Sequence, residues 1–234
     1  MTISRRALAI ALALAGLVAL LSFARHDLIG DAVAQDGTAQ DAKPPDRTAQ
    51  NAMAALVAKP VSLPDMALGP AKAPVAITEY ASMSCPHCAA FDENVFPMLR
   101  SKYIDTGKVR FVFREFPLDV RAAAASMLAR CIANDDAEKF FGAIDTVFKQ
   151  QEQLIAQPKD TLIRIGKQAG LDDQAIERCE SDQAQLDKLS ADQKFAVDVL
   201  KVDATPTFFI NGEQVKGNMS FEDIDRKIGS LLKH

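Results

Sequence analysis

Two of the four cysteines in this 234-residue chain lie three positions apart, in Cys85-Pro86-His87-Cys88. Residues 73–82, just before the motif, are apolar and β-branched and predict a buried strand, whereas apolar residues after it recur at helical spacing. Proline favours the first position of a helix, so Cys85 should occupy the N-cap and Cys88 the first turn. The motif therefore fixes a strand, a turn and a helix start in succession.

A cysteine at a helix start is expected to ionise easily. The Cys85 sulfur would face unpaired N–H groups and the positive end of the helix dipole, and His87 adds a donor or a positive charge beside it. These effects lower the pKa of Cys85 and stabilise the reduced pair relative to its disulfide. Such a pair gives its disulfide away readily, so the sequence predicts a site that oxidises other thiols.

Two other interpretations of the motif remain open. A Cys-x-x-Cys pair is half of a zinc site, but a complete site needs two more ligands, and Cys131 and Cys179 stand singly in expected helices. A purely structural bridge is the second alternative, although bridges this tight are strained and make poor staples. We therefore expect neither a metal nor a cofactor.

The remaining strands lie on either side of a long helical region. Strands are expected at 109–116 and 206–210, and the second turns back at Asn211-Gly212 as a hairpin. A closing helix begins after Ser220, its N-cap. Between the strands the pattern predicts five helices, at 121–133, 137–149, 160–169, 172–179 and 183–199. This order describes one α/β sheet with a helical insertion.

The N-terminal residues predict export. Arg5-Arg6 precede fifteen apolar residues, and residues 32–34 offer a small-residue cleavage site. The leader, 1–34, is therefore either a cleaved signal peptide or an uncleaved anchor, because the apolar run extends nearly far enough to span a bilayer. The arginine pair also fits a twin-arginine signal. In either case the body of the protein leaves the cytoplasm.

The polar stretch 35–59 contains Gly and Pro and almost no apolar residues over most of its length, and is expected to be a flexible linker, with a short helix over 50–58 as an alternative. Residues 60–118 and 200–234 should then form the sheet domain, and 119–199 the helical insertion. A net charge of −4 without a basic patch argues against nucleic acid as a partner.

Two segments carry a specific resemblance to a known family. The sequences ITEYASMSCPHCAAF and, far downstream, VDATPTFFING resemble the thioredoxin-fold proteins of the DsbA type, the periplasmic disulfide oxidases. The resemblance covers roughly residues 60–232 and implies a thioredoxin-like fold, a central mixed β-sheet flanked by helices. It makes the Cys-Pro-His-Cys motif the redox-active site. It also makes Thr205-Pro206 a loop whose proline is cis and which positions the substrate backbone.

Three further residues are candidates. Glu79 lies in a strand that should be buried, where an acid is costly unless it is hydrogen-bonded or used. The resemblance implies a proton-shuttling carboxylate there, and the alternative is a solvated sheet edge. In an exported protein, Cys131 and Cys179 should form a structural disulfide that stabilises by up to about 4 kcal/mol. The alternative for these two is a pair of buried free thiols.

Three functions fit these residues. We favour a monomeric thiol oxidase that donates the Cys85–Cys88 disulfide to reduced, unfolded exported proteins through a mixed disulfide, with a quinone-linked membrane partner of the DsbB type as its reoxidant. A disulfide isomerase or reductase is the second, which Thr205 keeps open because the resemblance makes this position one that tunes redox behaviour. The third is a chaperone that uses the groove beside Pro206 without turnover. The expected location is the periplasm, with anchoring to the inner membrane left open.

Overall fold

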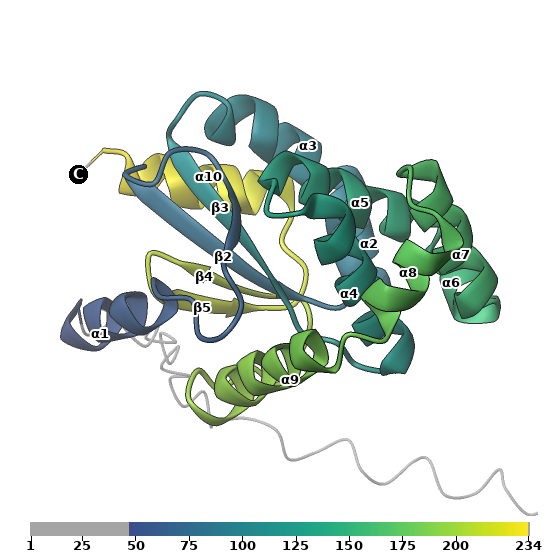
Figure 1. Ribbon diagram of the computed structural model, residues 1–234. Helices are drawn as coiled ribbons and strands as arrows, with labels where there is room; N and C mark the ends of the chain where they lie inside the picture. The colour runs from purple at the N-terminus through teal and green to yellow at the C-terminus, as the bar shows by residue number, and fades with distance from the viewer. Residues whose placement is uncertain (1–46, 234) are drawn as a thin grey trace, which may run out of the picture. The chain divides into compact units, whose positions relative to one another are not determined.

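The computed structural model describes residues 47–233 (Figure 1). The leader expected at 1–34, cleaved or retained, lies outside these residues, as do residues 35–46 of the expected linker. Within the described part of the chain, none of the helices combines the length and apolar character that crossing a membrane requires.

Five strands form one sheet in the order β1-β3-β2-β4-β5. Their bounds are Met66–Leu68 (β1), Val75–Ala81 (β2), Val109–Glu115 (β3), Thr207–Ile210 (β4) and Glu213–Lys216 (β5). Strands β2 and β3 are parallel, and the other neighbours are antiparallel. The mixed sheet that the family resemblance implies is therefore confirmed, with β2 between β3 and β4. The three-residue β1, which pairs with β3, was not expected.

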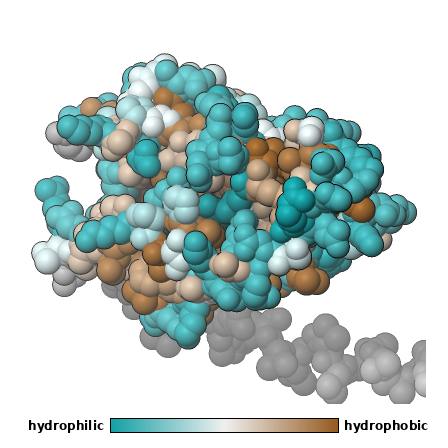
Figure 2. Space-filling view, viewed as in Figure 1, coloured by the Kyte–Doolittle hydropathy of each residue, from teal (hydrophilic) through white to brown (hydrophobic). Residues whose placement is uncertain are grey.

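The two faces of the sheet bury different side chains because successive residues of a strand point to opposite faces. Ile77 and Ala81 of β2 belong to the main core, under α2, α5 and α10, whereas Tyr80 belongs to a second core under α1 and α9 (Figure 1). Rings dominate the main core, where Phe91 lies 4.7 Å from Phe208 between ring centroids. On the outside, the face seen in Figure 2 is mostly hydrophilic, with apolar residues in separate smaller areas.

The helix after the cysteine motif is interrupted near Pro97. Helix α2 spans Pro86–Asn94, α3 spans Phe96–Leu99, and a π-helical turn follows at Arg100–Ile104. Pro97 lies in the first turn of α3, where its missing N–H group leaves no hydrogen bond unmade.

Six helices form the insertion between β3 and β4: α4 (Val120–Ala133), α5 (Ala137–Lys149), α6 (Gln151–Ala156), α7 (Pro158–Gln168), α8 (Asp173–Glu180) and α9 (Gln183–Asp198). Aspartates cap four of them, because the side chains of Asp119, Asp136, Asp172 and Asp182 accept hydrogen bonds from first-turn N–H groups. All five expected helices are present. The short α6 was missed, and it contributes to the site described below.

Two helices flank this assembly at the ends of the described chain. Helix α10, Phe221–Leu231, begins as expected after Ser220, whose Oγ accepts from the Asp223 N–H at 3.1 Å. At the other end, α1 spans Arg47–Val57, so this part of the expected linker is helical, and the helix begins three residues before the one that the sequence allows over 50–58.

Helix α1 is held in place by hydrogen bonds to distant segments. Gln50 Nε2 donates to the Asn211 carbonyl at 3.3 Å, and Arg114 donates to the Val57 carbonyl at 2.8 Å. Gly212 permits the close approach, since a Cβ there would lie 2.4 Å from the Gln50 oxygen. Tertiary contacts therefore fold a segment that could not bury much surface by itself.

Candidate active site

The cysteine motif lies where β2 ends and α2 begins. Cys85 is the N-cap of α2, with extended backbone angles (φ −85°, ψ 119°), and Pro86 occupies the first turn. The Cys85 carbonyl accepts from the N–H groups of Cys88 and Ala89 at 3.1 and 3.2 Å. Both motif cysteines are free thiols in this structure. The local sequence thus places one sulfur at the open end of the helix and the other one turn inside.

The surroundings of Cys85 favour its thiolate. A hydrogen bond from the Cys88 thiol contributes most to lowering the pKa of Cys85 to about 5, against the opposing effect of burial. The Thr205 side chain and the backbone N–H groups of Cys88 and His87 add further hydrogen bonds. At neutral pH the reduced pair therefore holds a thiolate at Cys85.

Cys88 has the opposite character. It is fully buried, and burial raises its pKa far above the ordinary value, with the neighbouring Cys85 and the acid Glu79 acting in the same direction. Cys85 is itself only 5% exposed, so it is solvent-facing only by comparison with Cys88. The two sulfurs nevertheless differ in the sense expected, with one ionised and the other protonated.

The His87 side chain does not follow the simple expectation. The residue is exposed, and its Nδ1 lies 3.1 Å from Nδ2 of Asn218, in the loop before α10. Since an amide nitrogen can only donate, Nδ1 accepts and the proton of the neutral ring is assigned to Nε2. His87 supports the Cys85 thiolate through its backbone N–H.

The loop expected to face the motif does so. The Thr205–Pro206 peptide bond is cis, and the Thr205 carbonyl lies 3.4 Å from the Cys85 sulfur, although 120 positions separate the two residues. Pro206 is buried and Thr205 half-buried. The fold thus brings together the two sequence segments that carry the family resemblance.

Glu79 lies beneath the active-site helix. It is 3% exposed, and in the sheet it pairs with Phe113 of β3 and Phe208 of β4, so the alternative of a solvated sheet edge is wrong. It shares its face of β2 with Ile77 and Ala81, which pack in the same core as Cys88. Burial raises the pKa of Glu79 well above its ordinary value, and negative charge on Asp92 and Cys85 raises it further.

Two residues near the motif escaped the sequence analysis. Asp92, one turn beyond Cys88, is 9% exposed beside a cavity of about 320 Å³, and burial raises its pKa to about 7. An acid on the apolar face of α2 was a signal that could have identified it. Gln151, the first residue of α6, donates to the backbone carbonyls of Met83 and Cys85. No local pattern marks it.

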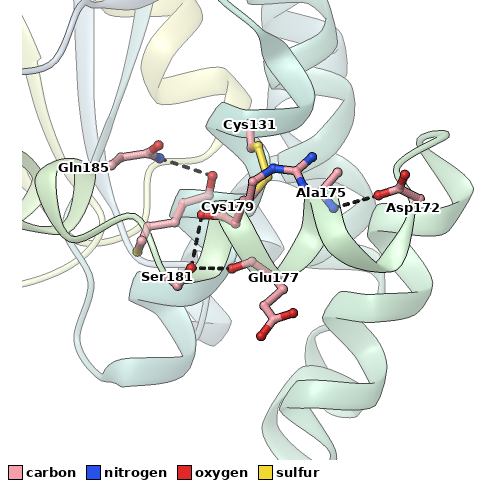
Figure 3. The surroundings of a disulfide bond; sticks show 9 residues. Cys131, Asp172, Ala175, Glu177, Cys179, Ser181 and Gln185 are labelled. Atoms are coloured by element: carbon pink, nitrogen blue, oxygen red, sulfur yellow. Dashed lines mark hydrogen bonds between the residues drawn. A yellow bond between two sulfur atoms is a disulfide. The ribbon is translucent and has the colours of Figure 1, made fainter.

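The other cysteines are joined to each other. Cys131 of α4 and Cys179 of α8 form a disulfide with their Cα atoms 5.8 Å apart (Figure 3). Asp172 accepts from the Ala175 N–H at 2.7 Å at the start of α8, and the Ser181 hydroxyl donates to the Glu177 carbonyl at 2.7 Å at its end (Figure 3). The bridge therefore ties two well-capped helices of the insertion.

This bridge also bears on the zinc alternative. Sulfurs engaged in a disulfide cannot complete a tetrahedral site with the Cys85–Cys88 pair. Among residues 47–233, no cluster of three or more His, Cys, Asp or Glu side chains is arranged to hold a metal ion.

The chain is similar to known thioredoxin-like and disulfide-forming proteins. The family model described as Thioredoxin matches residues 62–229. A protein of Rickettsia bellii named "Putative protein-disulfide oxidoreductase" is 35% identical over 171 residues, which cover 72% of this chain and 65% of that protein. A Bacillus cereus protein named "Probable disulfide bond formation protein D" is 31% identical over 176 residues, covering 71% and 78%. The chain spans 60–65% of the length of the Rickettsia relatives it matches.

A solved structure extends the similarity to three dimensions. The crystal structure of Wolbachia pipientis alpha-DsbA1 superposes with a TM-score of 0.70 at 33% sequence identity, covering 77% of this chain and 96% of that one.

Proposed function

This chain belongs to the thioredoxin family and is similar to its DsbA-type members, and on that premise we propose that it is a thiol:disulfide oxidase. Its disulfide would be the one between Cys85 and Cys88, donated to reduced, unfolded exported proteins. The observation that carries the proposal is the opposite ionisation of the two sulfurs, with the pKa of Cys85 near 5 and that of Cys88 raised. A stabilised thiolate in the reduced form makes the disulfide a good oxidant.

The reaction proceeds in two exchanges. A substrate thiolate attacks the Cys85 sulfur, so the Cys85–Cys88 bond breaks and a mixed disulfide forms between substrate and Cys85. A second substrate thiolate then attacks the substrate sulfur of this bond and releases Cys85 as a thiolate. The substrate loses two electrons and gains a disulfide, while the enzyme becomes a dithiol. The low pKa of Cys85 makes it a good leaving group in the second exchange.

The first exchange needs a proton at Cys88. Its raised pKa makes the departing Cys88 thiolate a poor leaving group unless it is protonated. Glu79 lies on the face of β2 that packs in the same core as Cys88, and its raised pKa makes it easier to protonate than an ordinary carboxylate. We assign to Glu79 the donation of this proton, and its recovery when the pair is oxidised again.

The cis-proline loop and its neighbours suit a polypeptide substrate. Thr205 lies beside the Cys85 sulfur, where a substrate backbone in the mixed disulfide has to pass. Leu118 and Val120 are 56% and 79% exposed, and the Leu118 N–H donates to Ser82 Oγ at 3.2 Å, close before the motif. Apolar side chains exposed next to a reactive cysteine offer contact to an unfolded chain, which exposes apolar residues of its own.

The surroundings proposed for this activity follow from the same chemistry. The export signal expected at 1–34 and the Cys131–Cys179 bridge support an oxidising compartment, the periplasm, with or without an anchor in the inner membrane. Each turnover leaves the enzyme reduced, so an external oxidant is required, and we propose a quinone-linked membrane protein of the DsbB type. We propose that the oxidase acts as a monomer.

A disulfide isomerase or reductase is the second candidate, favoured by threonine before the cis-proline. A chaperone without turnover is less well supported, because the two thiols lie in a reactive setting.

The deciding experiment mixes the oxidised full-length chain with an equal amount of reduced, unfolded protein without other oxidant. An oxidase removes two thiols from the substrate for each enzyme molecule. If the substrate keeps its thiols while the reduced enzyme readily reduces protein disulfides, the oxidase proposal is wrong and the protein is a reductase.

A further inference from the structure

The helical insertion reaches the active-site loop through one buried amide. Gln151 is 9% exposed, and its Nε2 donates to the carbonyl oxygens of Met83 at 2.9 Å and Cys85 at 3.0 Å. The two bonds span 68 and 66 positions of sequence. An amide nitrogen carries two hydrogens, so both are used on the same short loop.

These carbonyls belong to the backbone that shapes the motif. Met83 is itself 1% exposed, and Gln151 is the donor that its carbonyl has in this structure. The Cys85 carbonyl also accepts from the first turn of α2, so its orientation is tied to the direction of that helix. Without Gln151 the buried Met83 carbonyl would have no donor, whereas the Cys85 carbonyl would keep those of α2, so the bond to Met83 is the costlier one to lose.

Covering the core does not require an amide at position 151 of α6. A buried glutamine is costly unless its polar atoms are bonded, and an apolar residue would bury as well without that requirement. Leu154 of the same helix does this and is fully buried. The bonds of Gln151 therefore indicate a role in holding the loop rather than in packing.

We propose that Gln151 is a positioning residue that holds the Met83–Cys85 backbone so that the N–H groups of α2 point at the Cys85 sulfur. Through it, the helical insertion helps to set how oxidising the Cys85–Cys88 pair is. In the oxidised protein the covalent bond fixes both sulfurs. In the reduced protein only non-covalent contacts hold Cys85, so loss of Gln151 costs the reduced form more. The inference rests on the proposed oxidase function.

The test variant is Gln151→Met, which keeps the side-chain length and removes both donors. Gln151 lines the cavity of about 320 Å³ that also borders Asp92, and a smaller residue would let water replace the lost donors. Gln153→Met is the matched control, because Gln153 lines the same cavity from the same helix but is exposed. Gln151→Asn keeps the amide one methylene shorter and should give a smaller change in the same direction.

Each full-length protein is equilibrated with glutathione, and the Cys85 thiolate is titrated by its ultraviolet absorbance. For Gln151→Met we expect the disulfide to be favoured about three- to tenfold over the parent, tenfold corresponding to about 30 mV, with a raised Cys85 pKa. Gln153→Met should match the parent. Equal values for the parent, Gln151→Met and Gln151→Asn would overturn the inference.

The design separates two failures. If the parent protein itself has an ordinary Cys85 pKa and a weakly oxidising pair, the proposed function fails. If the parent is oxidising and the Gln151 variants are unchanged, only the role of Gln151 fails. Should Gln151→Met not fold, Gln151→Asn decides alone, and its agreement with the parent would count against the inference.

Discussion

The chain holds two cysteine pairs at opposite ends of helices. Cys85 caps the start of α2 and Cys88 lies in its first turn, whereas Cys131 and Cys179 lie in the last turns of α4 and α8. A helix start offers free N–H groups and positive potential, and a helix end offers carbonyl oxygens and negative potential. The first setting stabilises a thiolate and the second disfavours it.

This difference explains how one protein can hold a stable disulfide, Cys131–Cys179, and a readily reduced one, Cys85–Cys88. A disulfide is easily reduced when its product thiolate is stabilised, and it resists reduction when its thiols are buried and stay protonated. Cys179 is 4% exposed and lies in the last turn of α8, so the positive end of that helix does not stabilise its reduced form. The position of each cysteine along its helix, together with its hydrogen bonds and burial, distinguishes the redox site from the structural disulfide here.

The largest effect expected is on activity. Cys85→Ser should reduce thiol oxidation to the uncatalysed background, because the attacked sulfur of the disulfide is gone. The measurement is the loss of thiols from a reduced, unfolded protein. Replacement of Cys131 and Cys179 together by alanine is the control and should leave most of the oxidation in place. Equal loss in both variants would remove the distinction between the two pairs.

The Cys131–Cys179 disulfide should contribute to stability rather than to activity. The double variant Cys131→Ala and Cys179→Ala should lower the free energy of unfolding by about 4 kcal/mol, because a bridge over 48 positions restricts the unfolded chain. Denaturant unfolding of the variant and the parent measures this value. Reduction of the Cys85–Cys88 pair alone opens a much shorter loop and is the control. An unchanged midpoint for the double variant would show that the bridge is not a staple.

Glu79→Gln should slow the exchange that releases Cys88 by about a hundredfold at neutral pH, because the amide keeps the shape and loses the proton. Rapid mixing of oxidised protein with a small thiol measures this step. Asp92→Asn is the matched control, since Asp92 is also a buried acid near the motif. A Glu79→Gln rate within twofold of the parent would exclude Glu79 as the proton donor.

The smallest effect is expected at His87. Its ring contacts Asn218, so His87→Ala should raise the Cys85 pKa by less than about one unit, or 1.4 kcal/mol. The alkylation rate of the reduced parent should fall as the pH drops through about 5, since only the thiolate reacts. The variant should follow the same curve, displaced slightly upward in pH. A shift of two units or more would mean that the imidazole, and not the helix start, dominates.

Much of this could be predicted because the signals are local. The apolar run of β2, the turn at Asn211-Gly212 and the N-cap at Ser220 each act within a few residues, and the structure has the elements they predict. The two cysteines of the motif could be assigned for the same reason, since the helix start places Cys85 at its open end and Cys88 one turn inside.

What escaped depends on contacts between distant segments. Strand β1 exists through pairing with β3, and α1 through contacts with Asn211 and Arg114. Gln151 acts 66 positions away from Cys85, so no spacing in the sequence marks it. The cis bond before Pro206 was expected only from the family resemblance, because a proline opening a strand is equally compatible with a trans bond.

The most direct test of the account follows both cysteine pairs in one redox titration. The full-length protein is equilibrated over a series of glutathione ratios, its thiols are trapped with acid and alkylated, and peptides are mapped by mass. The account predicts that Cys85 and Cys88 become alkylated under weakly reducing conditions while Cys131 and Cys179 stay bridged throughout, with two free thiols per chain. Reduction of both pairs together, or of Cys131–Cys179 first, would contradict it.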